Sequence, residues 1–424
     1  MKINPPKNPN YAATVVRVRH INQLANCDNV IGVPVLGYQA ISSKNTQVGD
    51  LVLAFGAETQ LSLEYASSNN LHRHTELNVD PDVSGYLEDN RRIKALKFRG
   101  HRSDALLMPL ESLEYLSIDV SQLKEGDTFD HLDGHEICRK YEVRQPNARG
   151  AVAVKSVRKQ RVDDLMLPKH FDTANYFRVA GQIKPDDQVV ITQKLHGTSV
   201  RVGHTLVERK LSWLEKVARK LGIQVRETEY AYVYGSRNVV KDPENPFAKG
   251  EFYGTDLYTQ VGSKLKGLLP KGYVVYGEIV GWVPDTNTPI QRGYTYRIPE
   301  GLAELYIYRV TTVNEDGRQV DLSWPAVKEF CQSVGLETVP ELEIAPGYRV
   351  TEDWVTEHFL DTQFARFSAD ALRTEGVADE GVCLRVEGLT PFVVKAKSPE
   401  FLRHESKMLD KGVLDVEAAE DVIV

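Results

Sequence analysis

The sequence predicts an α+β protein in two parts, a small antiparallel β-barrel followed by a larger domain built on antiparallel sheets. A chain of 424 residues exceeds what one hydrophobic core usually serves. Short runs of β-branched residues recur along the chain, and only a few segments have helical periodicity. We expect the first part to span residues 1–135, a linker to span 136–163, and the second part to span 164–424.

The first part contains five apolar runs that alternate with turn residues. Short strands at such spacing are typical of a small barrel or sandwich. The runs are ATVVRVRHI, NVIGVPVLGYQAI, VGDLVLAF, RRIKALKF and DALLMPL. The segment that follows mixes charged residues with RQPNARG and has few large apolar side chains, which is typical of a linker.

The second part is predicted to contain mainly strands and two clear helices. In residues 211–221 apolar residues share one face of a helix, and Gly222 follows where helices commonly stop. In SWPAVKEFCQSVG, Ser323 is a candidate N-cap two places before Pro325. The face of the first helix comprises Leu211, Leu214, Val217, Ala218 and Leu221. The strand-like runs are DQVVITQKL, EYAYVYGSRNVV, GYVVYGEIVGW, AELYIYRVTTV, EGVCLRVEG and TPFVVKAKS.

Composition excludes several classes of protein. The four cysteines stand far apart, which argues against a disulfide framework and against a zinc ribbon. No apolar stretch approaches the roughly 20 residues that span a bilayer, so we expect a soluble, cytoplasmic protein without a membrane partner. The net charge of −7 alone disfavours nucleic-acid binding, but basic residues cluster locally at 91–102, 155–161 and 207–222.

Charged residues recur on predicted strands of the second part where a half-buried sheet usually has apolar ones. Lys194 ends a buried run and is followed by His196 and Gly197. Lys395 and Lys397 share one face of their strand, because side chains alternate along a strand. Two adjacent lysines repel unless an anion lies between them, and a polyphosphate is the natural candidate. Further strand residues of this kind are Arg237, Glu278 and Glu380.

The order of these residues resembles the covalent nucleotidyltransferases, which include ATP-dependent RNA and DNA ligases and messenger-RNA capping enzymes. Their K-x-[D/H]-G motif is matched by KLHG at 194–197, and the histidine resembles the RNA ligase 2-like branch. Later motifs are matched, in order, by YGE at 276–278, LYIYRV at 305–310, EGV at 380–382 and KAK at 395–397. One such motif can arise by chance, but five in order are a specific signal.

The resemblance also implies the fold and the ligands. It implies an OB-like first domain ahead of an antiparallel-sheet nucleotidyltransferase (ATP-grasp-like ligase) domain. Lys194 is then the nucleophile that takes AMP from ATP, and His196 serves the later transfer steps. Tyr308 stacks on adenine, and Lys395 and Lys397 hold the α-phosphate. The implied ATP site comprises Gln193, Lys194, Gly197, Arg237, Glu278, Tyr308, Lys395 and Lys397, with Mg²⁺ or Mn²⁺ at Glu380 and Glu278.

Lys194 must lose its proton before it can attack. The ordinary lysine pKa of about 10.4 leaves little free amine at neutral pH. A neighbouring cation or burial favours the neutral amine. We therefore expect the ammonium groups of Lys395 and Lys397, with a divalent cation and partial burial, to lower the pKa of Lys194.

A basic cluster in the first part has two interpretations. OB-type barrels bind nucleic acid through basic grooves and stacking aromatics, so the cluster fits an RNA-binding surface. It equally fits the outer face of a strand that docks against the second part. Its residues are Lys94, Lys97, Phe98, Arg99 and Arg102.

These observations predict an ATP-dependent RNA ligase that joins a 3′-hydroxyl to a 5′-phosphate, and we expect a monomer that acts on nicked duplexes. The predicted intermediates are a lysyl-AMP and an RNA-adenylate. The alternatives are a DNA ligase or guanylyltransferase of the same superfamily, and a non-catalytic nucleic-acid-binding protein with a ligase fold.

Overall fold

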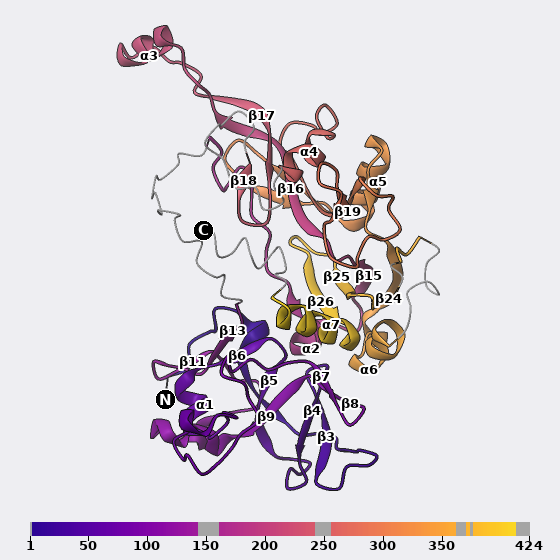
Figure 1. Cartoon of the computed structure of the whole chain (residues 1–424). Coiled ribbons are helices and arrows are strands. Elements are labelled where there is room, and N and C mark those ends of the chain that lie inside the picture. Colours follow the sequence, from indigo (N-terminus) through magenta and orange to yellow (C-terminus); the bar gives the residue numbers. More distant parts are fainter. Residues whose placement is uncertain (1, 143–160, 242–255, 362–369, 374–375, 413–424) are drawn as a thin grey trace.

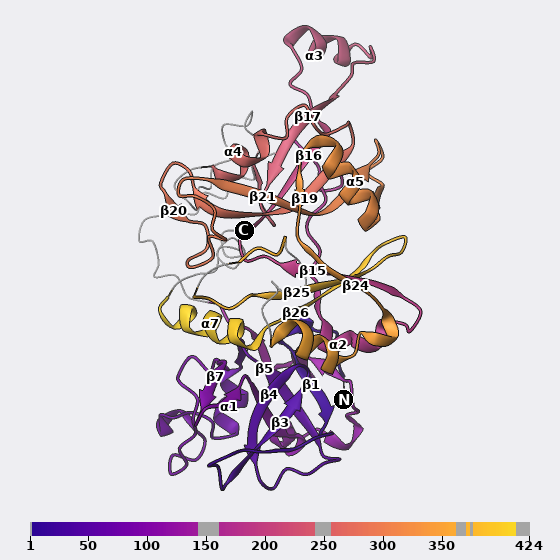
Figure 2. The ribbon, with the colours of Figure 1, turned by 90° about the vertical axis from the view of Figure 1, so that its right-hand side faces the viewer.

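A computed structural model describes residues 2–142, 161–241, 256–361, 370–373 and 376–412 (Figure 1). Figure 2 shows three β-sheets stacked along the molecule, with the N-terminal sheet at one end. The predicted α+β class is confirmed. Most of the predicted linker at 136–163 lies outside the described residues, and its first described residues include a strand that pairs with the N-terminal part.

The N-terminal part contains a seven-stranded sheet in the order β10-β1-β5-β9-β4-β3-β2. Among the described residues its edge strands β10 and β2 do not pair with each other, so the predicted closed barrel is not confirmed. Both faces of the sheet are covered: Leu53 and Phe55 of β5 point into one buried cluster, and Val52 and Ala54 into another. The strands are β1 (Ala13–Arg17), β2 (Asn22–Gln23), β3 (Val30–Val35), β4 (Tyr38–Ser43), β5 (Leu51–Gly56), β9 (Ala105–Pro109) and β10 (Thr128–Phe129).

Smaller elements surround this sheet. Three strand pairs are β6 (Thr59–Leu61) with β13 (Cys138–Lys140), β7 (Leu96–Phe98) with β8 (His101–Ser103), and β11 (His131–Leu132) with β12 (His135–Glu136). The helices are α1 (Leu63–Ser68) and the 3₁₀ turns η1 (Pro9–Tyr11), η2 (Thr75–Leu77), η3 (Leu110–Leu116) and η4 (Val120–Gln122).

The middle sheet has five strands in the order β14-β26-β25-β15-β24. Its strands are β14 (Ala174–Asn175), β15 (Gln188–Lys194), β24 (Glu341–Pro346), β25 (Gly381–Val386) and β26 (Phe392–Lys397). Helices next to it in sequence are α2 (Tyr176–Val179), η5 (Ala180–Gln182), η6 (Gly347–Arg349), α6 (Glu352–Val355), η7 (Thr356–Leu360) and α7 (Pro399–Asp410). Figure 2 shows α7 between this sheet and the N-terminal part.

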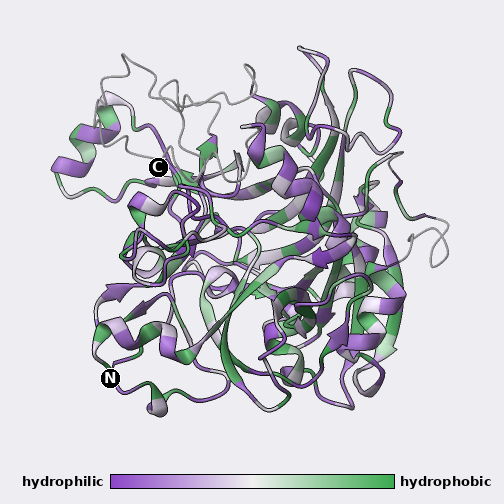
Figure 3. Cartoon of the chain, turned by 60° about the horizontal axis from the view of Figure 1, so that its bottom comes forward, coloured by the Kyte–Doolittle hydropathy of each residue, from purple (hydrophilic) through white to green (hydrophobic). Residues whose placement is uncertain are grey.

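The third sheet has eight strands, and its main path runs β18-β17-β16-β19-β21-β22. Figure 3 shows hydrophobic residues along many strands of the molecule, as expected for sheets packed on both faces. The strands are β16 (Thr198–Glu208), β17 (Thr228–Gly235), β18 (Val240–Lys241), β19 (Tyr273–Val283), β20 (Thr288–Pro289), β21 (Ala303–Val313), β22 (Gln319–Asp321) and β23 (Glu337–Thr338). The helices are α3 (Trp213–Lys220), α4 (Leu257–Ser263) and α5 (Trp324–Val334).

Both helices predicted from periodicity are present, but only one packs on a core. Helix α5 starts after Ser323 and ends at Gly335, whose φ of 69° suits glycine. Helix α3 lies at the tip of the β16–β17 hairpin, away from the sheets (Figure 1). Its apolar face is in solvent, because Leu214 is 61% exposed and Leu221 is 74% exposed. Within the described ranges, no helix has both the length and the apolar character needed to cross a membrane.

Candidate active site

The turn that carries Lys194 joins the middle sheet to the eight-stranded sheet. Lys194 is the last residue of β15, and β16 begins at Thr198 in the other sheet. Between them, Gly197 lies so close to β19 that an added Cβ would be 2.2 Å from the carbonyl oxygen of Ile279. Only glycine fits there. The turn therefore places the lysine at the junction of two sheets.

Glu278 of β19 holds this turn. Its Oε1 accepts a hydrogen bond from the Gly197 amide at 3.0 Å, and its Oε2 accepts one from Ser199 Oγ at 3.1 Å. The backbone amide of His196 donates to Tyr296 Oη at 2.7 Å, and Gln291 Nε2 donates to the Gly197 carbonyl at 2.8 Å. Because both carboxylate oxygens of Glu278 contact the chain, its direct role here is to shape the turn.

Lys194 forms an ion pair with a buried carboxylate. Its Nζ lies 2.7 Å from Glu380 Oε1, and the Glu380 side chain is only 3% exposed. Burial, the largest single cause, acts to lower the pKa of Lys194, but Glu380, Cys383 and Glu278 together outweigh it and raise this pKa above its usual value. Burial and Lys397 act in the predicted direction, but the net shift in the ligand-free protein is a rise, opposite to the predicted lowering. The sequence does not reveal which carboxylate reaches the amine, so the sign of the shift was missed.

The second oxygen of Glu380 is available to a ligand. Oε2 is buried and has no hydrogen-bond partner among the described residues, with His196 Nδ1 at 3.6 Å. A divalent cation fits such an oxygen, because Mg²⁺ is commonly bound by one or two carboxylates together with substrate phosphates. No cluster of three or more potential metal ligands occurs in the described part of the chain, so a cation here depends on the nucleotide for further ligands. The other predicted ligand, Glu278, already accepts two hydrogen bonds.

The two lysines of β26 line the same cleft as Lys194. Gly381 of β25, which has a φ of 144°, is paired with Lys397 in the antiparallel register of β25 and β26. Lys397 Nζ lies 2.9 and 3.1 Å from the two carboxylate oxygens of Glu405 on α7. Burial, the largest single cause, acts to lower the pKa of Lys397, but Glu405, Tyr11 and Glu380 together outweigh it and raise this pKa well above its usual value. Lys395 contributes to the wall of the same cavity.

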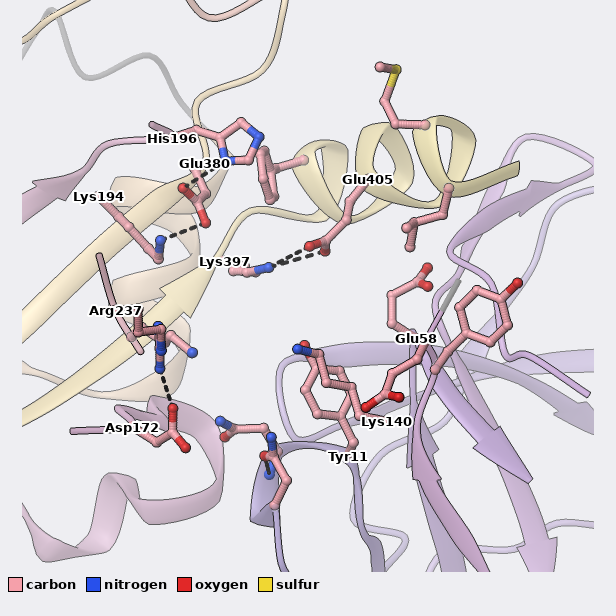
Figure 4. A pocket seen from close by; sticks show the side chains of 18 of the residues that line it. Tyr11, Glu58, Lys140, Asp172, Lys194, His196, Arg237, Glu380, Lys397 and Glu405 are labelled. Atoms are coloured by element: carbon pink, nitrogen blue, oxygen red, sulfur yellow. Dashed lines mark hydrogen bonds and ion pairs between the residues drawn. The ribbon is translucent and has the colours of Figure 1, made fainter. Parts of the chain in front are cut away.

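The cleft has a volume of about 710 Å³ and combines residues of the N-terminal part with residues of the middle and eight-stranded sheets (Figure 4). Lys194, His196 and Glu380 lie on one wall, and Tyr11, Glu58 and Lys140 of the N-terminal part lie across from them. A cavity of about 160 Å³ shares Lys194, Glu278, Lys395 and His170 with it and is further lined by Tyr308 and Cys383. Charged groups thus surround the large cleft, and aromatic and apolar groups line the small cavity.

The remaining predicted ATP contacts lie around these cavities with defined partners. Tyr308 Oη lies 2.8 Å from His170 Nδ1, and its ring borders the smaller cavity. Arg237, which lines both cavities, pairs with Asp172. The Gln193 amide exchanges two hydrogen bonds with the backbone of Leu372, at 2.7 and 2.9 Å. The amide of Gln193 is therefore committed to the chain in the ligand-free protein.

The basic cluster of the first part lies partly against α7. Lys94 pairs with Asp410 at 2.9 Å, and Lys97 lies 3.4 Å from Glu400. Both partners are on α7, which fits the docking interpretation for these two lysines. Arg99 donates to the carbonyl of Asn26, and Arg102 pairs with Asp104. RNA binding by this cluster stays a prediction.

Sequence reasoning missed several residues that shape the cleft. His196 packs edge-on against Tyr294 and Phe401, with ring centroids 4.8 and 5.0 Å apart. The predicted site included His196 but not its neighbours Tyr294 and Phe401, and it did not include Glu405 or Tyr11. A signal was present for α7, because Ser398 followed by Pro399 is a typical helix start and puts Glu405 near the strand that carries Lys397. No local pattern pointed to Tyr11.

Comparison with known proteins bears on this geometry. Residues 187–397, about half the chain, match the family model described as RNA ligase, and the match includes all five motifs. The chain belongs to the RNA ligase family. The predicted enzyme class, an ATP-dependent RNA ligase, is thereby confirmed. Among proteins with curated functions, no sequence matches this RNA ligase.

Solved structures extend the likeness beyond the matched residues. The Naegleria gruberi RNA ligase with PPi is 14% identical with a TM-score of 0.60, covering 93% of this chain and 98% of that chain. A mutant of that ligase with ATP and Mn has 14% identity and a TM-score of 0.57, with coverages of 94% and 99%. Another mutant, with AMP and Mn, has 14% identity and a TM-score of 0.57, with coverages of 92% and 98%. At this identity the likeness shows a shared fold, and it includes the N-terminal part.

Proposed function

We propose that this RNA ligase joins a 3′-hydroxyl to a 5′-phosphate of RNA through a lysyl-AMP at Lys194 and an RNA-adenylate. The observation that carries the proposal is the placement of Lys194 in the cleft, beside Glu380 and on a wall shared with Lys395 and Lys397. Similar structures hold ATP with Mn, AMP with Mn, or PPi, which supports ATP and a divalent cation as the ligands of this cleft.

In the first step, Nζ of Lys194 attacks the α-phosphorus of ATP. A nitrogen–phosphorus bond forms, the bond from the α-phosphorus to the oxygen that bridges to the β-phosphate breaks, and pyrophosphate leaves with the electron pair. The amine must first release its proton, which Glu380 stabilises in the ligand-free protein. Binding of ATP and a cation at Glu380 would separate this pair and free the amine.

In the next two steps the AMP moves to RNA and then leaves. An oxygen of the RNA 5′-phosphate attacks the AMP phosphorus, the nitrogen–phosphorus bond breaks, and Lys194 regains its amine. The 3′-hydroxyl then attacks the 5′-phosphorus, loses its proton, and displaces AMP. His196 lies beside Glu380 in the cleft, which supports a role for its ring in these transfers.

The chain contributes mainly position and charge to these steps, as is usual in phosphoryl transfer. Lys395 and Lys397 neutralise phosphate charge, Tyr308 borders the cavity proposed for adenine, and Arg237 lies where sugar or phosphate would pass. Glu278 fixes the turn and thereby the lysine. A divalent cation on the free oxygen of Glu380 would further neutralise the phosphates.

A sealing assay tests the proposal. The purified protein is given a duplex with one nick, a 5′-labelled phosphate, a 3′-hydroxyl, and ATP with Mg²⁺ or Mn²⁺. RNA and DNA are placed separately on each side of the nick, and GTP replaces ATP in a parallel arm. We expect sealing with ATP when RNA is present, and a transient adenylated strand. Sealing of all-DNA nicks alone would indicate a DNA ligase, labelling of the protein by GTP alone a guanylyltransferase, and no reaction a non-catalytic protein.

Several finer features stay predictions from the sequence. They are the division into domains at 1–135, 136–163 and 164–424, the OB-like nature of the first domain and its contact with RNA, the nicked-duplex substrate, the monomeric state and the cytoplasmic location.

A further inference from the structure

Glu405 is a partly buried acid that the reaction described above does not use. It lies on α7 with its side chain 17% exposed, and both of its oxygens contact the ammonium of Lys397, at 2.9 and 3.1 Å. The same ammonium lies 5.1 Å from the ring centroid of Phe401, one turn earlier on α7. Figure 4 shows the Lys397 side chain extending from β26 towards Glu405. Two groups of α7, the Glu405 carboxylate and the Phe401 ring, therefore contact this ammonium.

The helix that carries Glu405 is held from its other side by the N-terminal part. Ser406, the next residue, accepts a hydrogen bond from the Ala95 amide at 2.9 Å and donates one to Glu58. Arg92 donates to the Ser406 carbonyl and to Asp410, both at 2.9 Å. Arg92 and Glu58 are buried. Direct contacts thus connect the N-terminal part, through α7, with Lys397, which lines the cleft.

We propose that Glu405 is a positioning residue for the adenylylation of Lys194, and that the N-terminal part sets its position by gripping α7 at Ser406 and Asp410. The inference rests on the proposed function. It adds one positioning residue, Glu405, and an effect of the N-terminal part on the lysine that Glu405 holds. An acid without a positioning role beside a phosphate-binding lysine would only weaken phosphate binding through its negative charge. A bidentate acid that fixes the ammonium instead lowers the number of orientations the lysine samples before ATP binds.

The experiment measures single-turnover transfer of AMP from α-labelled ATP to the full-length protein at saturating ATP. It compares Glu405→Gln, which keeps the size but removes the charge, with Glu405→Asp and Asp410→Asn. The matched control is Glu400→Gln on the same helix, which removes an exposed contact with Lys97. Both the rate constant and the labelled fraction are recorded, because misfolding lowers the fraction whereas misplacement of Lys397 lowers the rate constant.

We expect Glu405→Gln to lower the rate constant by about 10- to 100-fold with the labelled fraction retained, since small misplacements have such effects. Glu405→Asp should recover part of this loss, Asp410→Asn should lose about 2- to 5-fold, and Glu400→Gln should match the wild type. Glu405→Gln within twofold of Glu400→Gln would overturn the inference, as would a fall in labelled fraction and melting temperature without a change in rate constant.

Two further outcomes are distinguishable from these. If Glu405→Gln does not fold, Glu405→Asp and Asp410→Asn decide the matter, and rates equal to that of Glu400→Gln overturn the inference. If the wild-type protein itself takes no label, the proposed function fails and this inference fails with it. Labelling of the wild type with equal rates in all variants refutes only the role of Glu405.

Discussion

The cleft around Lys194 and the tip of the β16–β17 hairpin differ in how well a local sequence pattern predicts which side chains are buried. In the cleft, the charged residues that look out of place on predicted strands, such as Lys194 and Glu380, are partly or fully buried and form an ion pair with each other. At the tip, α3 has the apolar face of a core helix, yet that face is in solvent. The ion pairs there, Arg209 with Glu215 and Arg219 with Glu227, are surface pairs. The periodicity of apolar residues predicts that a helix forms, whereas only tertiary contacts decide whether its apolar face is buried.

The comparison can be sharpened first by removing a large side chain from the cleft wall. Phe401 is 1% exposed and packs against the rings of His196 and Tyr294. We expect Phe401→Ala to lower the free energy of unfolding by about 3–5 kcal/mol, because a cavity replaces the ring. Urea denaturation followed by circular dichroism measures this. A loss below about 1 kcal/mol would mean that the cleft wall is no better packed than a surface.

The next largest effect is expected from Glu380, the acid that holds Lys194. Glu380→Gln removes the charge that pairs with the amine and weakens the oxygen proposed to bind a cation. We expect AMP transfer to fall at least 100-fold, or about 2.7 kcal/mol of barrier. The control, Glu343→Gln, removes a pair with Arg349 on the outer strand β24 and should remain within twofold of the wild type. A rate for Glu380→Gln within fivefold of the wild type contradicts this role.

A smaller effect, visible only as a function of pH, is expected at Glu58. Burial raises the pKa of Glu58 to about 7 although Arg92 acts to lower it. Because the folded protein binds this proton more tightly than the unfolded chain, the stability that it contributes is present in acid and is lost as the pH rises towards 7. Glu58→Gln keeps the neutral form. Its free energy of unfolding should match that of the wild type at pH 5 and exceed it at pH 8 by on the order of 1–2 kcal/mol, which appears as a higher melting temperature at pH 8. A difference between variant and wild type that is the same at pH 5 and at pH 8 would contradict the raised pKa of Glu58.

The smallest effect is expected at the hairpin tip. Trp213 is 72% exposed and Leu214 is 61% exposed. Replacing both with alanine should change the free energy of unfolding by less than about 0.5 kcal/mol, because neither side chain is removed from water on folding. The same urea denaturation serves as the measurement. A loss comparable to that of Phe401→Ala would show that α3 packs on a core in solution.

The sequence predicted more of the site than of its energetics. The convergence of Lys194, Glu278, Glu380 and Lys397 followed from motif order, because each motif ends or lies on a strand of two neighbouring sheets. Their pairing did not follow, since contacts between β15, the segment before β25 and α7 join residues far apart in the chain. The predicted direction of the pKa shift at Lys194 was consequently opposite to the one that the structure gives.

The N-terminal part shows the same limit. Its strands were predicted from β-branched runs, but closure of a barrel depends on whether the edge strands meet, and no local pattern encodes that. The basic cluster around Lys94 was compatible with RNA or with docking, because a charge pattern does not name its partner. The contacts of Lys94 and Lys97 with α7 supply partners that the sequence alone left open.

The central claim is that the amine at position 194 takes AMP covalently. Mass spectrometry of peptides from the protein, after incubation with ATP and Mn²⁺, tests this most directly. The account predicts one added AMP on the peptide that contains Lys194, released again when pyrophosphate is supplied and absent in Lys194→Arg. AMP attached at another residue, or an unmodified protein that nevertheless seals RNA, would contradict it.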